Sequence, residues 1–114
     1  MHNKDLDFKK KIVYLGISAD IFHHGHINII NKAKVLGKLT IGLLTDKAIS
    51  EKKRIPMLNW DQRHQILKNI SGVSRVVKQH EWDYSKNLLK YKPDIFIHGD
   101  DWKHKDSSDY KARS

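Results

Sequence analysis

Short apolar runs alternate with longer amphipathic stretches along the chain. The runs at residues 12–17 and 39–44 have the length of buried strands, and residues 73–77 and 94–98 predict a third and a fourth strand. Stretches with apolar residues three to four positions apart predict helices from residue 26 to 36, from 59 to 70 and from 83 to 91. The polar connection at residues 45–57 has room for one helical turn before Pro56. This alternation predicts an α/β fold with a parallel sheet and right-handed crossovers.

Local signals mark where the predicted helices begin and end. Asn59 followed by Gln62 three residues later is typical of an N-terminal capping box. Gly37 and Pro93 follow the last apolar positions of two other helical stretches and predict their ends. The helices are therefore bounded by sequence as well as by periodicity.

Two polar clusters follow the first and the fourth predicted strand. His23-His24-Gly25-His26 comes after the first strand, and Gly99-Asp100-Asp101-Trp102 comes after the fourth. Ligands of parallel α/β sheets bind outside the carboxyl ends of the strands, where the strand order reverses. With the strands in the order 3-2-1-4, both clusters face one crevice, and we expect the functional site there.

Composition and charge limit what the chain can be. Its 114 residues fit one domain, which we assign to residues 11–103, after a polar segment at residues 1–10 and before a polar, poorly ordered tail at residues 104–114. The sequence has no cysteine and no run close to the roughly 18 apolar residues of a membrane span. Without a signal peptide, a cytoplasmic location is the expectation. The formal net charge of +9 favours anionic ligands.

The histidine cluster has the chemistry of a phosphate site. His23 and His26 flank Gly25, which lets the backbone approach a ligand closely. His26 falls at a predicted helix N-terminus, where free N–H groups and the helix dipole favour an anion. Metal binding, with His98 and Asp100 as further ligands, is an alternative that these residues leave open.

These motifs resemble those of a known family. The sequence GISADIFHHGH at residues 16–26, with Thr45-Asp46, Asp61-Gln62-Arg63 and GDDW at residues 99–102, is similar to the cytidylyltransferase-like nucleotidyltransferases. The resemblance covers about residues 11–103 and implies a Rossmann-like, doubly wound parallel sheet in one domain. Within the family, the wording is most similar to the 2-aminoethylphosphonate cytidylyltransferases.

The resemblance implies transfer of CMP from CTP to a phosphonate or phosphate oxygen, with release of pyrophosphate. It assigns His23, His26 and Lys52 to catalysis on the phosphates. The residues that it places around the nucleotide are Gly16, Ile17, His23, Gly25, His26, Arg54, Arg63, Gly99 and Asp100. It implies Mg²⁺ held through the CTP phosphates and no metal site made by protein side chains. For Arg63, a buried structural ion pair is the alternative.

The resemblance places the acceptor between Asp20 and Trp82. A carboxylate and an indole face suit an alkylammonium group, which favours 2-aminoethylphosphonate. Glycerol-3-phosphate, phosphocholine and phosphoethanolamine are the alternative acceptors. The resemblance also implies a homodimer, and the sequence suggests neither a nucleic-acid nor a membrane partner.

One departure from the family concerns its last strand and a motif similar to R-T-x-G-I-S-S-T, which residues 104–114 do not contain. We therefore expect a sheet without that strand, and the activity of this sequence on its own is open. The alternatives are a fragment of a longer enzyme, a non-catalytic nucleotide-binding module, an adenylyltransferase and, from the charge, a nucleic-acid-binding module.

Overall fold

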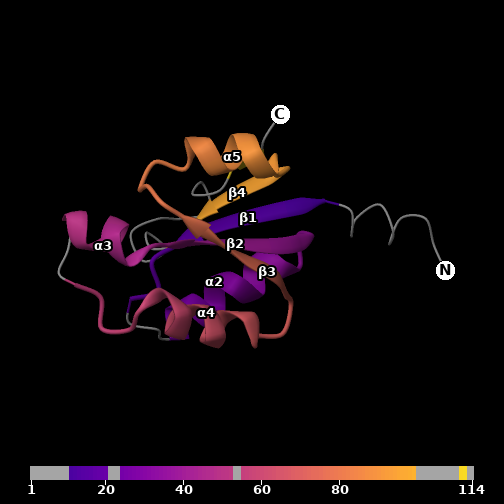
Figure 1. The fold of residues 1–114 in the computed structure, drawn as a ribbon. Coiled ribbons are helices and arrows are strands. Elements are labelled where there is room, and N and C mark those ends of the chain that lie inside the picture. Colours follow the sequence, from indigo (N-terminus) through magenta and orange to yellow (C-terminus); the bar gives the residue numbers. More distant parts are fainter. Residues whose placement is uncertain (1–10, 21–23, 53–54, 100–110, 113–114) are drawn as a thin grey trace, which may run out of the picture.

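A parallel sheet forms the centre of the computed structural model, which describes residues 11–20, 24–52, 55–99 and 111–112 (Figure 1). Its strands are β1 (Ile12–Ile17), β2 (Lys38–Leu44), β3 (Val73–Gln79), β4 (Ile95–His98) and β5 (Lys111–Ala112). They lie in the order β3-β2-β1-β4-β5, and β1 to β4 are parallel. The predicted order of the first four strands is confirmed.

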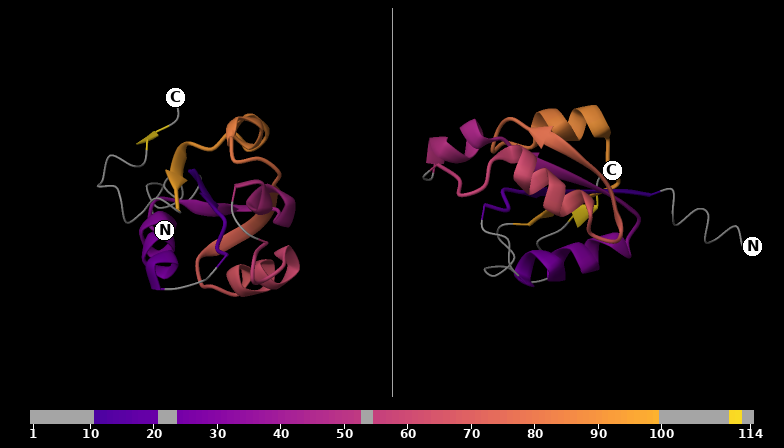
Figure 2. Two further views of the ribbon diagram at one scale, coloured as in Figure 1. Left: turned by 90° about the vertical axis from the view of Figure 1, so that its left-hand side faces the viewer. Right: turned by 60° about the horizontal axis from the view of Figure 1, so that its bottom comes forward.

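Helices cover both faces of this sheet. They are α2 (His24–Lys34), α3 (Asp46–Lys52), α4 (Trp60–Lys68) and α5 (Ser85–Tyr91). Figures 1 and 2 show α2 and α4 on one face and α5 on the other, with α3 directly after the carboxyl end of β2. The Rossmann-like, doubly wound architecture is thus confirmed. None of the helices in the described part of the chain is long and apolar enough to cross a membrane.

The main hydrophobic core lies between the sheet and the pair α2 and α4. Its fully buried members include Leu15 of β1, Ile41 of β2, Ile30 of α2 and Leu67 of α4. Tyr14 of β1 is also fully buried, and its hydroxyl accepts a hydrogen bond from Asn87 of α5, on the opposite face. Burial on both faces explains why β1 and β2 are nearly continuous apolar runs without alternation.

The capping box of α4 is confirmed. The Asn59 side chain accepts a hydrogen bond from the backbone N–H of Gln62 at 2.9 Å, and the Gln62 side chain accepts one from the backbone N–H of Asn59 at 2.9 Å. In α3 the prediction of one turn is wrong, because the helix runs over seven residues. The Thr45 hydroxyl accepts a hydrogen bond from the N–H of Ala48 and stabilises the start of α3 right after β2.

The ends of α5 are set by a carboxylate and a left-handed residue. Asp83 accepts hydrogen bonds from the backbone N–H and the hydroxyl of Ser85, and these bonds lower the pKa of the Asp83 carboxyl. The helix begins after Asp83, not at it as predicted. It ends at Tyr91, the following C-cap residue Lys92 has a φ of 48°, and Pro93 comes next.

The short strand β5 was not predicted. The polar composition of residues 104–114 suggested a poorly ordered tail, yet Lys111 and Ala112 pair antiparallel with Phe96 and Ile95 of β4. The rest of that tail and the polar segment at residues 1–10 lie outside the described residues.

Candidate functional site at the carboxyl edge

The carboxyl ends of β1 and β4 bring the two polar clusters of the sequence together. Gly16 of β1 pairs in register with His98 of β4, and the N–H of Gly99 donates a hydrogen bond to the Gly16 carbonyl at 2.9 Å. Gly99 therefore lies beside the end of β1. This is the edge of the sheet at which the strand order predicts the functional site. Asp100 follows Gly99 directly but lies outside the described residues.

The first turn of α2 holds the histidine motif. Gly25 and His26 are both buried, and the side chain of His26 belongs to a residue only 4% exposed. His26 is thus held at a helix N-terminus beside the end of β1. The predicted partner His23 lies outside the described residues. A buried imidazole next to the N–H groups of a first helical turn can donate a hydrogen bond to a phosphate oxygen.

Asp20 lies at the start of the same connection and is almost completely buried. Its Oδ1 atom accepts a hydrogen bond from the backbone N–H of Met57 at 2.9 Å. The preceding residue, Ala19, has a φ of 50°, a region that residues other than glycine rarely adopt. Asp20 therefore joins the end of β1 to the connection between α3 and α4.

Trp82 packs against α3 and the end of β2. Its Nε1 donates a hydrogen bond to the Ala48 carbonyl at 2.6 Å, and its ring packs on the small cluster around Leu44 and Ile49. The ammonium group of Lys52 lies 5.4 Å from the centre of this ring. The structure thus brings together Lys52 and Trp82, a pairing that sequence reasoning did not predict. Asp20 and Trp82, predicted to form one cage, have different partners in the structure.

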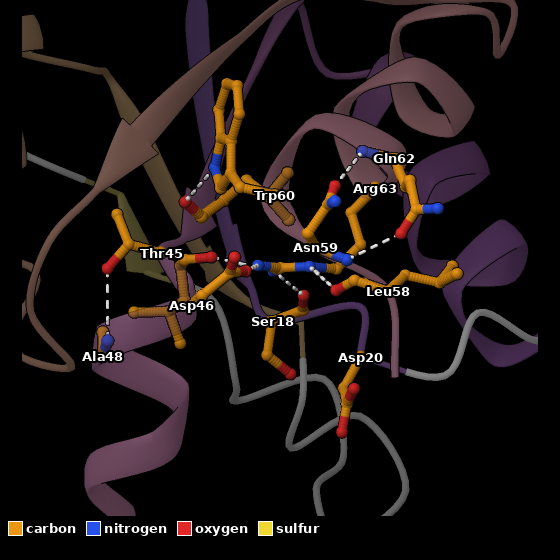
Figure 3. A network of polar contacts seen from close by, with 12 residues as sticks. Ser18, Asp20, Thr45, Asp46, Ala48, Leu58, Asn59, Trp60, Gln62 and Arg63 are labelled. Atoms are coloured by element: carbon orange, nitrogen blue, oxygen red, sulfur yellow. Dashed lines mark hydrogen bonds and ion pairs between the residues drawn. The ribbon is translucent and has the colours of Figure 1, made fainter. Parts of the chain in front are cut away.

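Arg63 forms the densest polar network at this edge (Figure 3). Its guanidinium group donates to the carbonyls of Ser18 and Leu44, both at 2.7 Å. It also donates to the Leu58 carbonyl at 3.1 Å and to Asp46 Oδ1 at 2.5 Å. The Arg63 side chain is fully buried.

The partners of Arg63 come from four segments: the end of β1, the end of β2, the start of α3 and the loop before α4. With four bonds to the protein, the guanidinium group has little capacity left for a nucleotide. The geometry supports the structural ion pair that the sequence left as an alternative, with Arg63 fully buried and Asp46 46% exposed.

Gly16 and Gly99, which the resemblance places at the nucleotide, lie where close packing leaves no room for a side chain. A Cβ atom on Gly16 would lie 2.3 Å from a ring carbon of Tyr84, and one on Gly99 would lie 1.8 Å from Cγ2 of Ile17. The side chain of Ile17 itself is part of the main core. Any contact of these three residues with a nucleotide would therefore be made by their backbone.

Tyr84 is a site residue that sequence reasoning missed. Its ring lies against Gly16 and meets the ring of His98 edge-on, with the centroids 4.8 Å apart. An aromatic residue two positions after Trp82, just before a predicted helix, was the available signal. Tyr84 therefore places an aromatic ring beside the carboxyl ends of β1 and β4.

A buried hydrogen-bond chain supports the segment that carries Trp82. The Tyr14 hydroxyl donates to Gln79 Oε1 at 2.5 Å, and Gln79 Nε2 donates to the Glu81 carbonyl at 2.8 Å. Burial raises the pKa of Tyr14 to about 12, against the opposing effect of the hydrogen bond from Asn87. The strand β1 thus fixes the turn that precedes Trp82.

A metal site made by side chains finds no support in the described part of the chain. No group of three or more His, Asp or Glu side chains there is placed to hold an ion. Two members of the alternative zinc set, His23 and Asp100, lie outside the described residues, as does the predicted phosphate contact Arg54.

The fold defines a Rossmann-like α/β protein. Its strand order reverses at β1, and the first turn of α2, which contains His26, follows the carboxyl end of that strand. The family model described as cytidylyltransferase-like matches residues 14–113. The chain therefore belongs to the cytidylyltransferase-like family.

Individual relatives agree with this assignment. The glycerol-3-phosphate cytidylyltransferase of Bacillus spizizenii is 35% identical over 98 residues, which cover 84% of this chain and 75% of the relative. The FAD synthase of Methanobrevibacter smithii is 33% identical, with 83% of this chain and 65% of the relative covered. The ethanolamine-phosphate cytidylyltransferase of Arabidopsis thaliana is 30% identical, over 78% of this chain and 23% of the relative.

A solved structure supports the fold. The crystal structure of the lipopolysaccharide core biosynthesis protein from Thermoplasma volcanium superposes with a TM-score of 0.71 at 28% identity. The match covers 76% of this chain and 72% of that one.

Proposed function

We propose that the chain is a nucleotidyltransferase that transfers CMP from CTP to a small phosphonate or phosphate monoester and releases pyrophosphate. The observation that carries the proposal is the buried His26 in the first turn of α2, at the carboxyl end of β1 and beside the end of β4. Family membership supports the same chemistry.

In the proposed reaction, an acceptor oxygen forms a bond to the α-phosphorus of CTP. The bond from that phosphorus to the bridging oxygen breaks, and pyrophosphate leaves with the electron pair. Such a transfer needs alignment and charge stabilisation rather than a covalent enzyme intermediate. His26 and the N–H groups of α2 would stabilise the charge at the phosphorus, and Lys52, exposed at the end of α3, would neutralise the phosphates.

Magnesium belongs to the proposal as the ion that neutralises the triphosphate when bound. We assign it to the phosphate oxygens, since Mg²⁺ in such sites takes few ligands from the protein.

For the acceptor we favour 2-aminoethylphosphonate. The ammonium group of Lys52 lies 5.4 Å from the centre of the Trp82 indole ring, and this cation–π contact supports the ring as a position for an alkylammonium group. The carboxylate of Asp20 would add charge complementarity from the end of β1. A homodimer remains part of the proposal on the family resemblance alone.

Glycerol-3-phosphate is the second candidate acceptor. It is favoured by the name of the Bacillus spizizenii relative, which aligns over three quarters of its own length. A polyol has no positive charge to place on Trp82, so the two acceptors make different demands on the same residues.

Replacing His26 tests the proposed site. His26→Asn removes the imidazole and keeps a polar side chain, and we expect turnover to fall by about 10²–10³-fold, the usual cost of one preorganised donor to a transition state. The matched control is His80→Asn, since His80 is exposed in the loop after β3. Circular dichroism checks that both variants are folded. A folded His26→Asn protein that keeps its turnover, measured as pyrophosphate release, would contradict the assignment.

A further inference from the structure

A polar pocket lies at the end of the sheet opposite to the carboxyl edge. It has a volume of about 270 Å³ and is lined by Ile12, Lys38, Thr40, Ser74 and Arg75. Ile12 and Lys38 are the first residues of β1 and β2, and Ser74 and Arg75 lie near the start of β3. The pocket is therefore at the amino ends of the strands, opposite to the edge that holds His26.

An irregularity in the sheet brings two adjacent side chains into this pocket. Leu39 pairs with Val73 but Thr40 pairs with Arg75, so that Ser74 is an extra residue in β3. In a regular strand, neighbouring side chains point to opposite faces. A bulge breaks this alternation and re-aims a side chain, which explains why Ser74 and Arg75 both line the pocket.

Arg75 is held in place by two contacts. Its Nε donates a hydrogen bond to the Thr40 hydroxyl at 3.2 Å, and its guanidinium carbon lies 4.8 Å from the centre of the Tyr91 ring. Within the described part of the chain, the terminal amino groups of Arg75 have no hydrogen-bond partner. A guanidinium group fixed through Nε and one ring face presents these two donors as a fork for an oxyanion.

The charge around the pocket is mostly positive. Lys38 adds an exposed ammonium group, and the ammonium group of Lys90 lies 5.4 Å from the centre of the Tyr91 ring. Among the residues that the structure describes, no carboxylate lines the pocket. The Asp94 side chain accepts a hydrogen bond from the N–H of Ile12, so this nearby acid is already paired with the backbone.

From this arrangement we infer a second anion site, specific for a doubly charged tetrahedral oxyanion of the phosphate class. The Arg75 amino groups and the Lys38 ammonium group bind its oxygens, and the Ser74 hydroxyl donates a further hydrogen bond. The oxyanion comes either as free phosphate or as the headgroup of a phosphomonoester lipid. The inference does not depend on the proposed transfer reaction.

Inorganic phosphate added to the ¹⁵N-labelled full chain tests the site by NMR. We expect saturable shifts of the Thr40 and Ser74 amides and of the Arg75 Nε–H. Arg75→Gln and Lys38→Gln should each weaken the affinity read at Thr40 by about tenfold or more, as loss of a charge-assisted hydrogen bond of about 1.5–3 kcal/mol implies. Lys68→Gln, at an exposed residue in the last turn of α4, removes the same charge and should leave the affinity within about twofold.

Three outcomes would overturn the inference. They are the absence of saturable shifts at these residues, equal shifts with chloride at the same ionic strength, and equal weakening by Lys68→Gln, which would indicate general charge attraction. Vesicles of phosphatidylcholine with and without phosphatidic acid distinguish the two sources of the oxyanion. If the protein binds vesicles that contain phosphatidic acid and Arg75→Gln abolishes this binding, the oxyanion is the lipid headgroup. If only inorganic phosphate causes the shifts, the oxyanion is the free ion.

Discussion

Arg63 shows how one side chain determines the shape of the carboxyl edge. Its bonds to Ser18, Leu44 and Leu58 fix the ends of two strands and the loop before α4 relative to one another. The same loop donates the N–H of Met57 to Asp20. Arg63 therefore acts on the site through the backbone, and its role is positioning.

Replacement of Arg63 should lower the stability of the fold more than it lowers the affinity for CTP. Arg63→Lys keeps the charge but cannot reproduce the bonds to three carbonyls and Asp46. We expect the free energy of unfolding to fall by about 3–5 kcal/mol, typical for breaking a buried charged network. Asp46→Asn, at a side chain 46% exposed, should cost about 1 kcal/mol or less. Urea unfolding without nucleotide measures both. Unchanged stability together with lost CTP binding would instead indicate direct contact with the nucleotide.

Trp82 is the residue at which the acceptor can be tested. If its ring holds an ammonium group, Trp82→Leu should raise KM for 2-aminoethylphosphonate by about 30-fold, corresponding to a desolvated cation–π contact of about 2 kcal/mol. Trp82→Phe loses the hydrogen bond to Ala48 but keeps a ring face. It should therefore retain most of the affinity for 2-aminoethylphosphonate. The KM for CTP serves as the control. If glycerol-3-phosphate is the better acceptor of the unmodified protein, the aminophosphonate assignment fails.

At the scale of elements, a buried polar chain connects β1, β3 and α5. The Tyr14 hydroxyl lies between Gln79 and Asn87, with bonds of 2.5 and 2.8 Å. A Cβ atom on Gly42 would lie 1.7 Å from that hydroxyl, so the glycine in β2 makes room for it. Because Gln79 also holds the Glu81 carbonyl, these elements determine where Trp82 lies.

Tyr14→Phe should destabilise the fold in a pH-dependent way. Loss of the hydroxyl leaves the buried Oε1 of Gln79 without this donor, at a cost of about 1–3 kcal/mol below pH 9, whereas Asn87 Nδ2 keeps its bond to the Lys78 carbonyl. The pKa of Tyr14 is raised from 10.0 to about 12, so the unfolded chain loses this proton before the folded one. The stabilisation from the hydroxyl is therefore complete below pH 10 and declines, by up to about 3 kcal/mol, as the pH rises to 12. Urea unfolding of both proteins at pH 8, 10 and 11.5 should show the difference shrinking. A constant difference would contradict the pKa shift.

Much of the element order follows from local sequence. The apolar runs predict β1 and β2 because strands buried on both faces need continuous apolar residues, whereas β3 lies at the edge of the sheet and is partly exposed. The capping box before α4 is likewise a purely local signal. By contrast, β5 depends on pairing with β4, and α3 is polar over much of its surface and is held by contacts of Ala48 and Ile49 with the sheet.

The candidate site was predictable in part. The motifs place His26 and Asp20 at the carboxyl edge of the sheet, because the loops that follow neighbouring parallel strands lie at the same edge. The partners of Arg63 and the ring of Tyr84 against Gly16 depend on residues far apart in the sequence, which local patterns do not connect.

At the scale of the whole molecule, the proposed nucleotide site lies at the carboxyl edge of the sheet, in a chain with a formal net charge of +9. If the carboxyl edge is specific for cytidine, CTP with Mg²⁺ should raise the unfolding temperature by several degrees, since a ligand at 100 times its Kd stabilises by about 2.7 kcal/mol. ATP, GTP and UTP at the same concentration should have smaller effects. The His26→Asn protein is the control. Equal shifts with all four nucleotides would remove the assignment to cytidine.

The central claim is that the chain transfers CMP, and product analysis tests it most directly. The purified protein is incubated with CTP labelled in the α-phosphate, Mg²⁺ and either 2-aminoethylphosphonate or glycerol-3-phosphate, and labelled products and pyrophosphate are counted. The account predicts a labelled CMP–acceptor conjugate and pyrophosphate in a ratio of one to one, greatly reduced in His26→Asn and unchanged in His80→Asn. A protein that binds CTP but yields neither product with any phosphonate or phosphate monoester would contradict the transferase assignment and support a non-catalytic nucleotide-binding module.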